Sequence, residues 1–188
     1  MDMFDGVGRR RDETEGRLFT LGSNSLNGNE RDCLFRNNGD GTFTDVAYVN
    51  NTDSVSDGRG LVVFDYDQDG RLDVGLRNYK QPAQLMHNVG AAGHWLQFKL
   101  VGTRSNRDAV GARITVRSGG TTQMREVHAG SAYLSGSSLV QHVGLGAATS
   151  AESVHIRWPS GAETTLHDVA ADQRITVQEE SDQPKPPM

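Results

Sequence analysis

Short apolar runs restrict this chain to a small set of folds. The runs are separated by Gly, Asn, Asp and Ser, and none shows a long apolar stripe at helical period. Several alternate strictly, as in Val154, Ile156 and Trp158, which are separated by His155 and Arg157. Such alternation places the apolar residues on one face of a strand and the polar residues on the other, as is common in antiparallel sheets. The pattern predicts an all-β protein.

The candidate strands end at turn-forming residues. They cover residues 18–22, 33–36, 42–46, 61–65, 72–76, 84–87, 95–101, 112–117, 123–128, 139–145, 153–158, 163–166 and 174–178. Gly119-Gly120 lies between two of them and predicts a two-residue hairpin turn with positive φ. The segment Trp158-Pro159-Ser160-Gly161 predicts a second tight turn.

The two halves of the chain differ in composition and in the length of their loops. Residues 1–90 are rich in Asn, Asp and Gly and have long loops, whereas residues 91–180 hold regular alternating strands. We therefore expect one domain over 1–90 and a second domain, an antiparallel β-sandwich, over 91–180. The last residues, 181–188, are polar and rich in proline, which predicts a disordered tail.

A weak repeat within the first half points to a propeller-like arrangement. An apolar strand that ends in Asn occurs at residues 34–38 and again at residues 84–88. A spacing of about 50 residues is typical of one propeller blade, but a closed propeller needs about four blades. A small open sheet is marginal unless something covers it, so we expect its apolar residues to pack on the sandwich. These residues are Leu61, Val63, Leu72, Val74 and Leu85. The alternatives are that they pack on the same surface of a second chain or on further propeller blades.

Composition excludes several classes of partner. The net charge is −5 at pH 7, and the single basic run is followed at once by acidic residues, which argues against nucleic acid. No apolar run approaches the roughly 20 residues of a membrane helix. Cys33 is the only cysteine, so neither an intrachain disulfide nor a thiolate metal cluster can form. The first eleven residues lack the apolar stretch of a signal peptide, so we expect no export signal here.

An acidic loop in the first half predicts a cation site. The loop follows the pattern D-x-D-x-D-G-x-x-D and contains Asp65, Asp67, Asp69, Gly70 and Asp73. Alternate residues of a tight loop can point their carboxylates at one centre, and calcium takes six to eight oxygen ligands. Four carboxylates this close repel one another unless a cation lies among them. We predict a calcium ion held by the four aspartate side chains and by the carbonyl of Arg71.

The surroundings of the loop separate it from an EF-hand. An EF-hand requires Glu at the twelfth position, where this chain has Leu76, and it requires flanking helices rather than strands. The alternative is an acidic surface turn that binds no ion. A second acidic segment, residues 37–42, is interpreted as a hairpin turn, with an ion site as the weaker alternative.

Two groups of motifs resemble known families. Residues 34–46 (LFRNNGDGTFTDV) and 60–73 (GLVVFDYDQDGRLD) resemble FG-GAP/VCBS repeats. Residues 94–179 resemble the ASPIC/UnbV domain. That resemblance depends on LVGTRSNRDAVGAR at 100–113, GSAYLS at 130–135, LG at 145–146 and RWPSG at 157–161.

The resemblance carries expectations of its own. FG-GAP/VCBS repeats form integrin-type β-propeller blades with calcium in the acidic loop. The pairing of the two domains is similar to the C-terminal end of cartilage acidic protein relatives and of UnbV-like proteins found near enediyne biosynthesis genes. Members of this family are mostly exported, which implies an extracytoplasmic location if the chain is a fragment. The resemblance brings no enzymatic activity with it.

The sequence favours a calcium-stabilised binding or scaffold module, with a protein, glycan or small molecule as ligand. No nucleophile elbow, phosphate loop or zinc motif is present. The alternative is a natural-product tailoring enzyme, lyase- or cyclase-like, in which calcium or residues such as Asp108 and His128 serve catalysis. Association with a second copy of the chain stays open.

One polar group in the second half is a candidate recognition site for the carboxylate of a ligand. An internal network of loop ion pairs is the alternative interpretation. The group consists of Arg104, Asn106, Arg107, Asp108 and Arg113.

Overall fold

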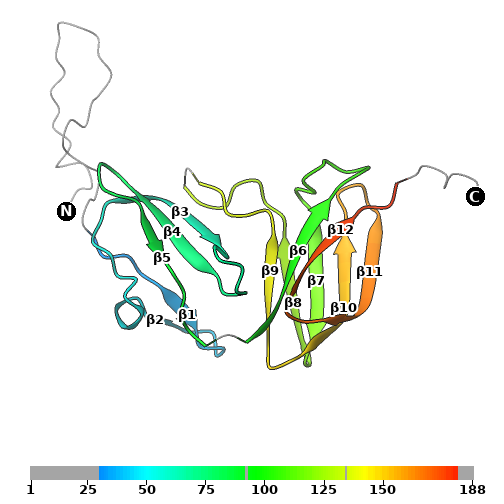
Figure 1. Ribbon diagram of the computed structural model, residues 1–188, viewed down its shortest axis with the longest axis horizontal. Coiled ribbons are helices and arrows are strands. Elements are labelled where there is room, and N and C mark those ends of the chain that lie inside the picture. Colours follow the sequence, from blue (N-terminus) through cyan, green and yellow to red (C-terminus); the bar gives the residue numbers. More distant parts are fainter. Residues whose placement is uncertain (1–29, 92, 134, 182–188) are drawn as a thin grey trace, which may run out of the picture. The chain divides into compact units, whose positions relative to one another are not determined.

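The computed structural model describes residues 30–91, 93–133 and 135–181. The predicted strand at residues 18–22 lies outside them, as does all but the first residue of the predicted tail. The described elements are β1 (Phe35–Asn37), β2 (Phe43–Asp45), the 3-10 turn η1 (Tyr48–Asn50), β3 (Gly58–Phe64), β4 (Asp73–Asn78), β5 (Gln84–Met86), β6 (His94–Val101), β7 (Arg113–Ser118), β8 (Thr121–Glu126), β9 (Gln141–Gly146), β10 (Ser150–Arg157), β11 (Glu163–Ala170) and β12 (Gln173–Gln178) (Figure 1). The all-β prediction is confirmed, and no sheet among these strands closes into a barrel.

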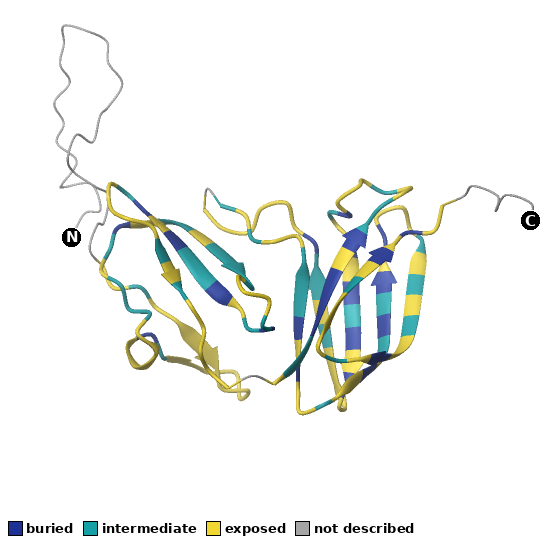
Figure 2. Ribbon diagram, viewed as in Figure 1, coloured by how far each residue is buried: buried dark blue, intermediate teal, exposed yellow. Residues whose placement is uncertain are grey.

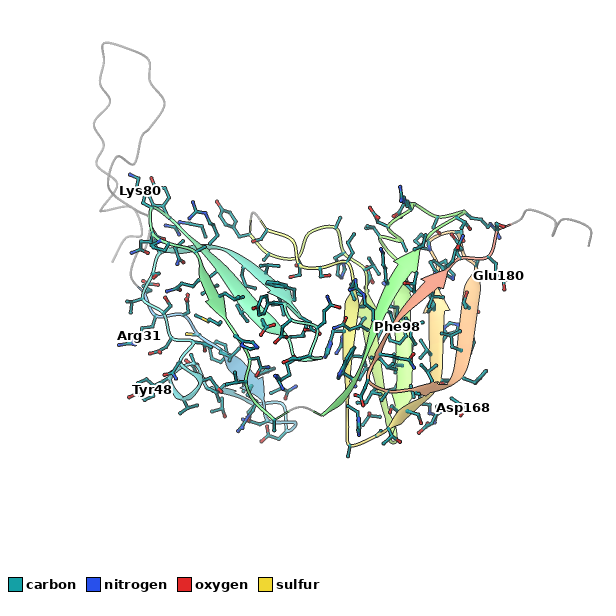
Figure 3. The ribbon with its side chains drawn as sticks, in the orientation of Figure 1. Arg31, Tyr48, Lys80, Phe98, Asp168 and Glu180 are labelled. Atoms are coloured by element: carbon teal, nitrogen blue, oxygen red, sulfur yellow. The ribbon has the colours of Figure 1, made fainter. Side chains whose placement is uncertain are left out.

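Two sheets form the sandwich. One has the order β11-β10-β7-β8 and the other β12-β6-β9. Leu96 and Phe98 of β6 are fully buried, and they pack in one core with residues such as Ile114 of β7 and Ile156 of β10. Figure 2 shows the buried residues gathered in these strands, and Phe98 is labelled in Figure 3. The alternation noted in the sequence therefore separates the core face from the outer face of each strand.

Two tight turns and one parallel strand pairing connect the strands of the sandwich. Gly119 and Gly120 both have positive φ, 54° and 76°, as the hairpin between β7 and β8 requires. Gly161, with φ of 89°, closes the predicted turn by donating its amide to the carbonyl of Trp158 at 3.0 Å. The pairing of β12 with β6 is parallel, whereas the other pairs of the sandwich are antiparallel. Strand alternation alone does not specify this difference.

The remaining strands form two small sheets, the hairpin β1-β2 and the sheet β3-β4-β5. By their contacts, the residues divide into two units, one up to Gly60 with Leu76–Gln84, the other Leu61–Gly75 with the residues from Leu85 on. The acidic loop between β3 and β4 therefore belongs to the same unit as the sandwich. The predicted domain bounds at 1–90 and 91–180 stay a prediction.

Part of the expected burial is wrong. Leu61, Leu72 and Leu85 keep exposed fractions of 40%, 36% and 49%. For Leu61 the physical reason is that the edge of β3 is met by serine hydroxyls rather than by an apolar layer. The amide of Leu61 donates to Ser135 Oγ at 3.1 Å, and the amide of Val63 donates to Ser137 Oγ at 3.3 Å. These bonds satisfy two backbone donors of the strand without burying its apolar side chains.

A buried carboxylate fastens one end of the sandwich. Glu179 is 1% exposed and follows β12 directly. Its Oε2 accepts hydrogen bonds from the backbone amides of Thr103, Arg104 and Ser105, at 2.9, 2.9 and 2.7 Å. Its Oε1 accepts hydrogen bonds from the hydroxyls of Ser105 and Ser160. The side chain thus joins the loop after β6 to the turn after β10.

Candidate metal centre

The acidic loop reverses the chain between β3 and β4. Asp65 follows the last residue of β3, and Asp73 is the first residue of β4. The reversal requires left-handed backbone at Gln68, with φ of 63°, and at Gly70, with φ of 84°. Glycine adopts this conformation without steric cost, which explains why the motif places it there.

The loop brings carboxylates together in two overlapping clusters. Oxygen atoms of Asp65, Asp67 and Asp73 all lie within 4.8 Å of one another, and so do ligand atoms of Asp67, Asp69 and His87. All four predicted aspartates thus take part, and Asp67 belongs to both clusters. His87 is not among the predicted ligands, but its Nε2 lies 3.1 Å from Asp67 Oδ2. This histidine follows β5, so only the pairing of β4 with β5 brings it near the loop.

Backbone amides hold the first and last carboxylates in place. Asp65 accepts the amides of Asp69 and Gly70 at 3.1 and 2.9 Å. Asp73 accepts the amides of Tyr66 and Asn88 at 2.9 and 2.8 Å. These bonds set the orientation of both carboxylates before any cation binds, which reduces the reorganisation needed for coordination.

Asp73 is ionised although it is only 1% exposed. Burial by itself raises the pKa of its carboxyl group. The hydrogen bonds from Asn88 and Tyr66, together with the nearby charges of His87 and Arg71, outweigh burial and lower the pKa below its ordinary value. A carboxylate that stays ionised in a buried position is suited to a hard cation.

Arg71 uses its side chain within the loop. Its guanidinium pairs with Asp69, and its Nε donates to the carbonyl of Asn88 at 2.8 Å. The ligand role predicted for the Arg71 carbonyl stays a prediction. The donor set fits calcium or magnesium, since it consists mainly of carboxylate oxygens, the ligands that hard divalent cations take. The residues Asp65, Asp67 and Asp73 would hold the ion, with Asp69 as a further ligand.

The sandwich contributes one wall beside the loop. Gln97 of β6 pairs with His142 of β9 and with Arg174 of β12, so the three residues form a row across that sheet. Gln97 Nε2 donates to Asp65 Oδ2 at 2.7 Å. A cavity of about 380 Å³ lies between this row and the loop, and its lining includes Asp65 and Leu72.

Trp95 of β6 covers the glycine of the loop. A Cβ atom added to Gly70 would lie 1.9 Å from Trp95 Nε1, so only glycine fits. We expect Gly70→Ala to lower the free energy of unfolding by more than the roughly 1–2 kcal/mol that left-handed backbone costs an L-residue. Urea unfolding followed by tryptophan fluorescence measures this change.

Gly39→Ala is a matched control for that substitution. Gly39 has φ of 83°, nearly the same as Gly70, but nothing lies within 4 Å of the added Cβ. The backbone cost is therefore shared, and the difference between the two variants reports the contact with Trp95. Equal losses of stability in the two variants would contradict the close packing of the loop on β6.

The polar group of the second half is spread over loop and strand. Asn106 donates through Nδ2 to the carbonyl of Val110 and accepts the amide of Val110, both at 2.9 Å, so its side chain holds the loop. Arg113 lies on β7, where its Nε donates to Glu126 at 2.7 Å, and it lines a cavity of about 230 Å³ together with Arg157. Arg104, Arg107 and Asp108 are exposed on the loop after β6. Their role in ligand binding stays a prediction.

The second acidic segment is a turn held by its own side chains. Asp40 Oδ1 accepts the amide and the hydroxyl of Thr42, at 2.9 and 2.6 Å. These bonds lower the pKa of Asp40. Asn37 Oδ1 accepts the amide of Gly39 at 2.8 Å. The side-chain oxygens of Asp40 and Asn37 thus accept hydrogen bonds within the hairpin between β1 and β2, in line with the interpretation as a turn.

Comparison with known proteins supports the families named from the motifs. Residues 19–76 match the model of the FG-GAP-like repeat, and residues 102–184 match the model "ASPIC and UnbV". Cartilage acidic protein 1 of Mus musculus is 35% identical over 129 residues, which cover 65% of this chain and 19% of the relative. The protein of the same name from Homo sapiens is 37% identical over 111 residues, covering 55% and 16%. That of Xenopus tropicalis is 34% identical over 79 residues, covering 42% and 12%.

These matches confirm the predicted resemblance. The chain spans less than a fifth of the length of the curated relatives it matches. Within the residues that the structure describes, no helix is long and apolar enough to cross a membrane.

Proposed function

We propose that this chain, in which an FG-GAP-like repeat is followed by an ASPIC and UnbV domain, is a calcium-binding β module that serves a binding or scaffold role outside the cytoplasm. The observation that carries the proposal is the convergence of Asp65, Asp67 and Asp73, whose oxygens lie within 4.8 Å of one another. The ligand that the module recognises is a protein, a glycan or a small molecule.

Electrostatics supports a cation at this point. Two unit charges about 4 Å apart repel by about 1 kcal/mol in bulk water and by about 4 kcal/mol at the effective dielectric near a protein surface. Three carboxylates therefore oppose the loop conformation, and the Arg71 guanidinium, which pairs with Asp69, offsets only part of their charge. A divalent ion removes this repulsion and replaces it with attraction.

The binding strength expected of such a site fits an extracellular setting. Calcium modules outside the cell have dissociation constants of roughly 10⁻⁴ to 10⁻³ M, near the calcium concentration around them. We expect an affinity in this range. The resemblance to a mostly exported family supports a location outside the cytoplasm, where an affinity in this range would suit the site. Fractionation of the producing cells tests the location, and recovery in the cytoplasm alone would contradict it.

Isothermal titration with calcium tests the proposed site directly. We expect one or more ions to bind to the chain, and we expect Asp65→Asn with Asp73→Asn to reduce the affinity at least tenfold, because each substitution removes a charged ligand. Asp168→Asn is the matched control. Asp168 is exposed, and asparagine tolerates its left-handed backbone, with φ of 51°. If the chain binds no calcium at millimolar concentration, or if the control loses as much affinity as the double variant, the proposal is wrong.

The recognition role has a separate test. Binding of the purified chain to a glycan array is compared in calcium and in chelator, with the double variant alongside. Calcium-dependent signals that the double variant lacks would support a role of the loop in recognition. Equal signals in both conditions would limit calcium to a structural role.

A further inference from the structure

We propose that the outer face of the β12-β6-β9 sheet forms a second wall of the cation site, and that Gln97 is a positioning residue that holds the Asp65 carboxylate for the cation. This inference rests on the proposed calcium function. It adds that the site is composite, because the repeat supplies the ligands and the sandwich supplies the group that orients one of them.

Gln97 is placed for this role by strand alternation. Its neighbours Leu96 and Phe98 point into the sandwich core and are fully buried, so the Gln97 side chain points out from the other face of β6. On that face Gln97 is only 6% exposed, because the acidic loop covers it. An amide side chain at such a position costs free energy unless it is hydrogen-bonded, and its partner is Asp65 Oδ2 at 2.7 Å.

The hydrogen bond constrains how Asp65 faces the cluster. Asp65 Oδ2 already accepts the amide of Gly70 at 2.9 Å, so the bond from Gln97 is its second. Asp65 Oδ1 accepts the amide of Asp69 at 3.1 Å, so three donors in all fix the carboxylate, and Oδ1 keeps a second lone pair that can face a cation. The donors that orient a metal ligand tune affinity through that ligand, and removing one costs about 10- to 100-fold in metal affinity.

Neighbouring side chains keep the wall in contact with the loop. Trp95, two residues before Gln97, lies against Gly70 so closely that a Cβ atom would not fit between them. The Trp95 ring stacks on His142, with ring centroids 6.2 Å apart and planes inclined by 17°. Gln97 therefore approaches Asp65 from a surface that packing holds in place, as a positioning role requires.

Linkage makes the effect reciprocal. If the Gln97 contact raises the affinity for calcium, calcium strengthens the contact between loop and sheet by the same factor. Calcium binding would then stabilise the packing of the acidic loop against the ASPIC and UnbV domain.

The test is Gln97→Met, which keeps the length of the side chain and removes the donor. We expect calcium affinity, measured by titration, to fall about 10- to 100-fold. With terbium in place of calcium, the luminescence lifetime in H₂O and D₂O counts the waters on the ion, and we expect the variant to gain water as Asp65 loosens. A merely structural role for Gln97 would leave that count unchanged.

Gln123→Met is the matched control. Gln123 lies on β8, and its Nε2 donates to the carbonyl of Gly144 at 2.7 Å, so the substitution also removes one amide donor from the sandwich. We expect wild-type affinity and water count for this variant. Equal losses in the two variants, or an affinity of Gln97→Met within about twofold of wild type, would overturn the inference.

A measurement on the unchanged chain covers the case in which Gln97→Met does not fold. In ¹⁵N spectra, calcium should shift the side-chain amide resonance of Gln97 and slow its hydrogen exchange, with no such change at Gln123. A Gln97 signal that calcium leaves unaffected would overturn the inference while binding itself is intact. A wild-type chain that binds no calcium would instead overturn the proposed function and this inference together.

Discussion

Replacing Glu179 with alanine is expected to lower the free energy of unfolding of the sandwich by about 3–5 kcal/mol, the cost typical of breaking a buried charged network. The carboxylate accepts three backbone amides and two hydroxyls. Without it, the amides of residues 103–105 lose a charged acceptor, and a hydrogen bond to a charged group contributes about 1.5–3 kcal/mol. Denaturant unfolding of the full chain measures the loss.

Glu180→Ala is the control, because Glu180 is the next residue and is exposed. It removes the same charge from the same segment without touching the network. We expect its effect to stay within about 0.5 kcal/mol, as for most surface substitutions. A comparable loss of stability in both variants would show that the charge of the segment, rather than the buried network, is responsible.

The Glu179 carboxylate also makes the free energy of unfolding depend on pH. Burial raises the pKa of Glu179, but the hydrogen bonds from the Ser160 hydroxyl and from the amides of Ser105, Thr103 and Arg104 outweigh burial and lower the pKa to about 2. An unfolded glutamate titrates at the ordinary value of 4.5. Because the folded-state pKa is the lower one, the contribution is complete above pH 4.5, declines as the pH falls, and is lost near pH 2. Its full size is roughly 3 kcal/mol.

The difference in unfolding free energy between wild type and Glu179→Gln isolates this effect from the other acids. We expect the difference to narrow steadily between pH 4.5 and pH 2. A difference that stays constant across this window would show that Glu179 titrates normally in the folded state.

Removing calcium is expected to raise the hydrogen-exchange rates of the acidic loop about 100-fold. A ligand present at 100 times its dissociation constant stabilises the state that binds it by about 2.7 kcal/mol, and chelation withdraws that stabilisation from the segment that holds the ion. The amides to observe are those that donate to loop carboxylates, namely Tyr66, Asp69, Gly70 and Arg71.

Amides in the centre of the sandwich serve as the internal reference. Val154 and Ile156 lie on β10, which is paired on both sides, and both are fully buried. We expect their exchange to change far less on chelation. A uniform change across loop and sandwich would mean that calcium stabilises the whole chain as one unit, and no change anywhere would contradict a structural role for the ion.

Local patterns in the sequence were enough to predict the fold class and the candidate ligands. Strand alternation and turn-forming glycines depend on neighbouring residues, so the sandwich strands and the turn at Gly119-Gly120 follow from the sequence. The acidic loop is equally local, because its four aspartates lie within one short segment, in which Gly70 allows the tight turn. A cluster built from a single short segment needs no knowledge of the rest of the chain.

The groups around the loop depend on pairings between distant segments. His87 reaches Asp67 only through the sheet β3-β4-β5, and Gln97 reaches Asp65 only because the sandwich packs against the loop. Glu179 reaches the loop after β6 because β12 pairs with β6 in parallel, and its position two residues before the predicted tail gives no sign of burial. Such contacts are decided by the packing of the whole domain, because sequence periodicity specifies which face of a strand is apolar but not which strand lies beside it.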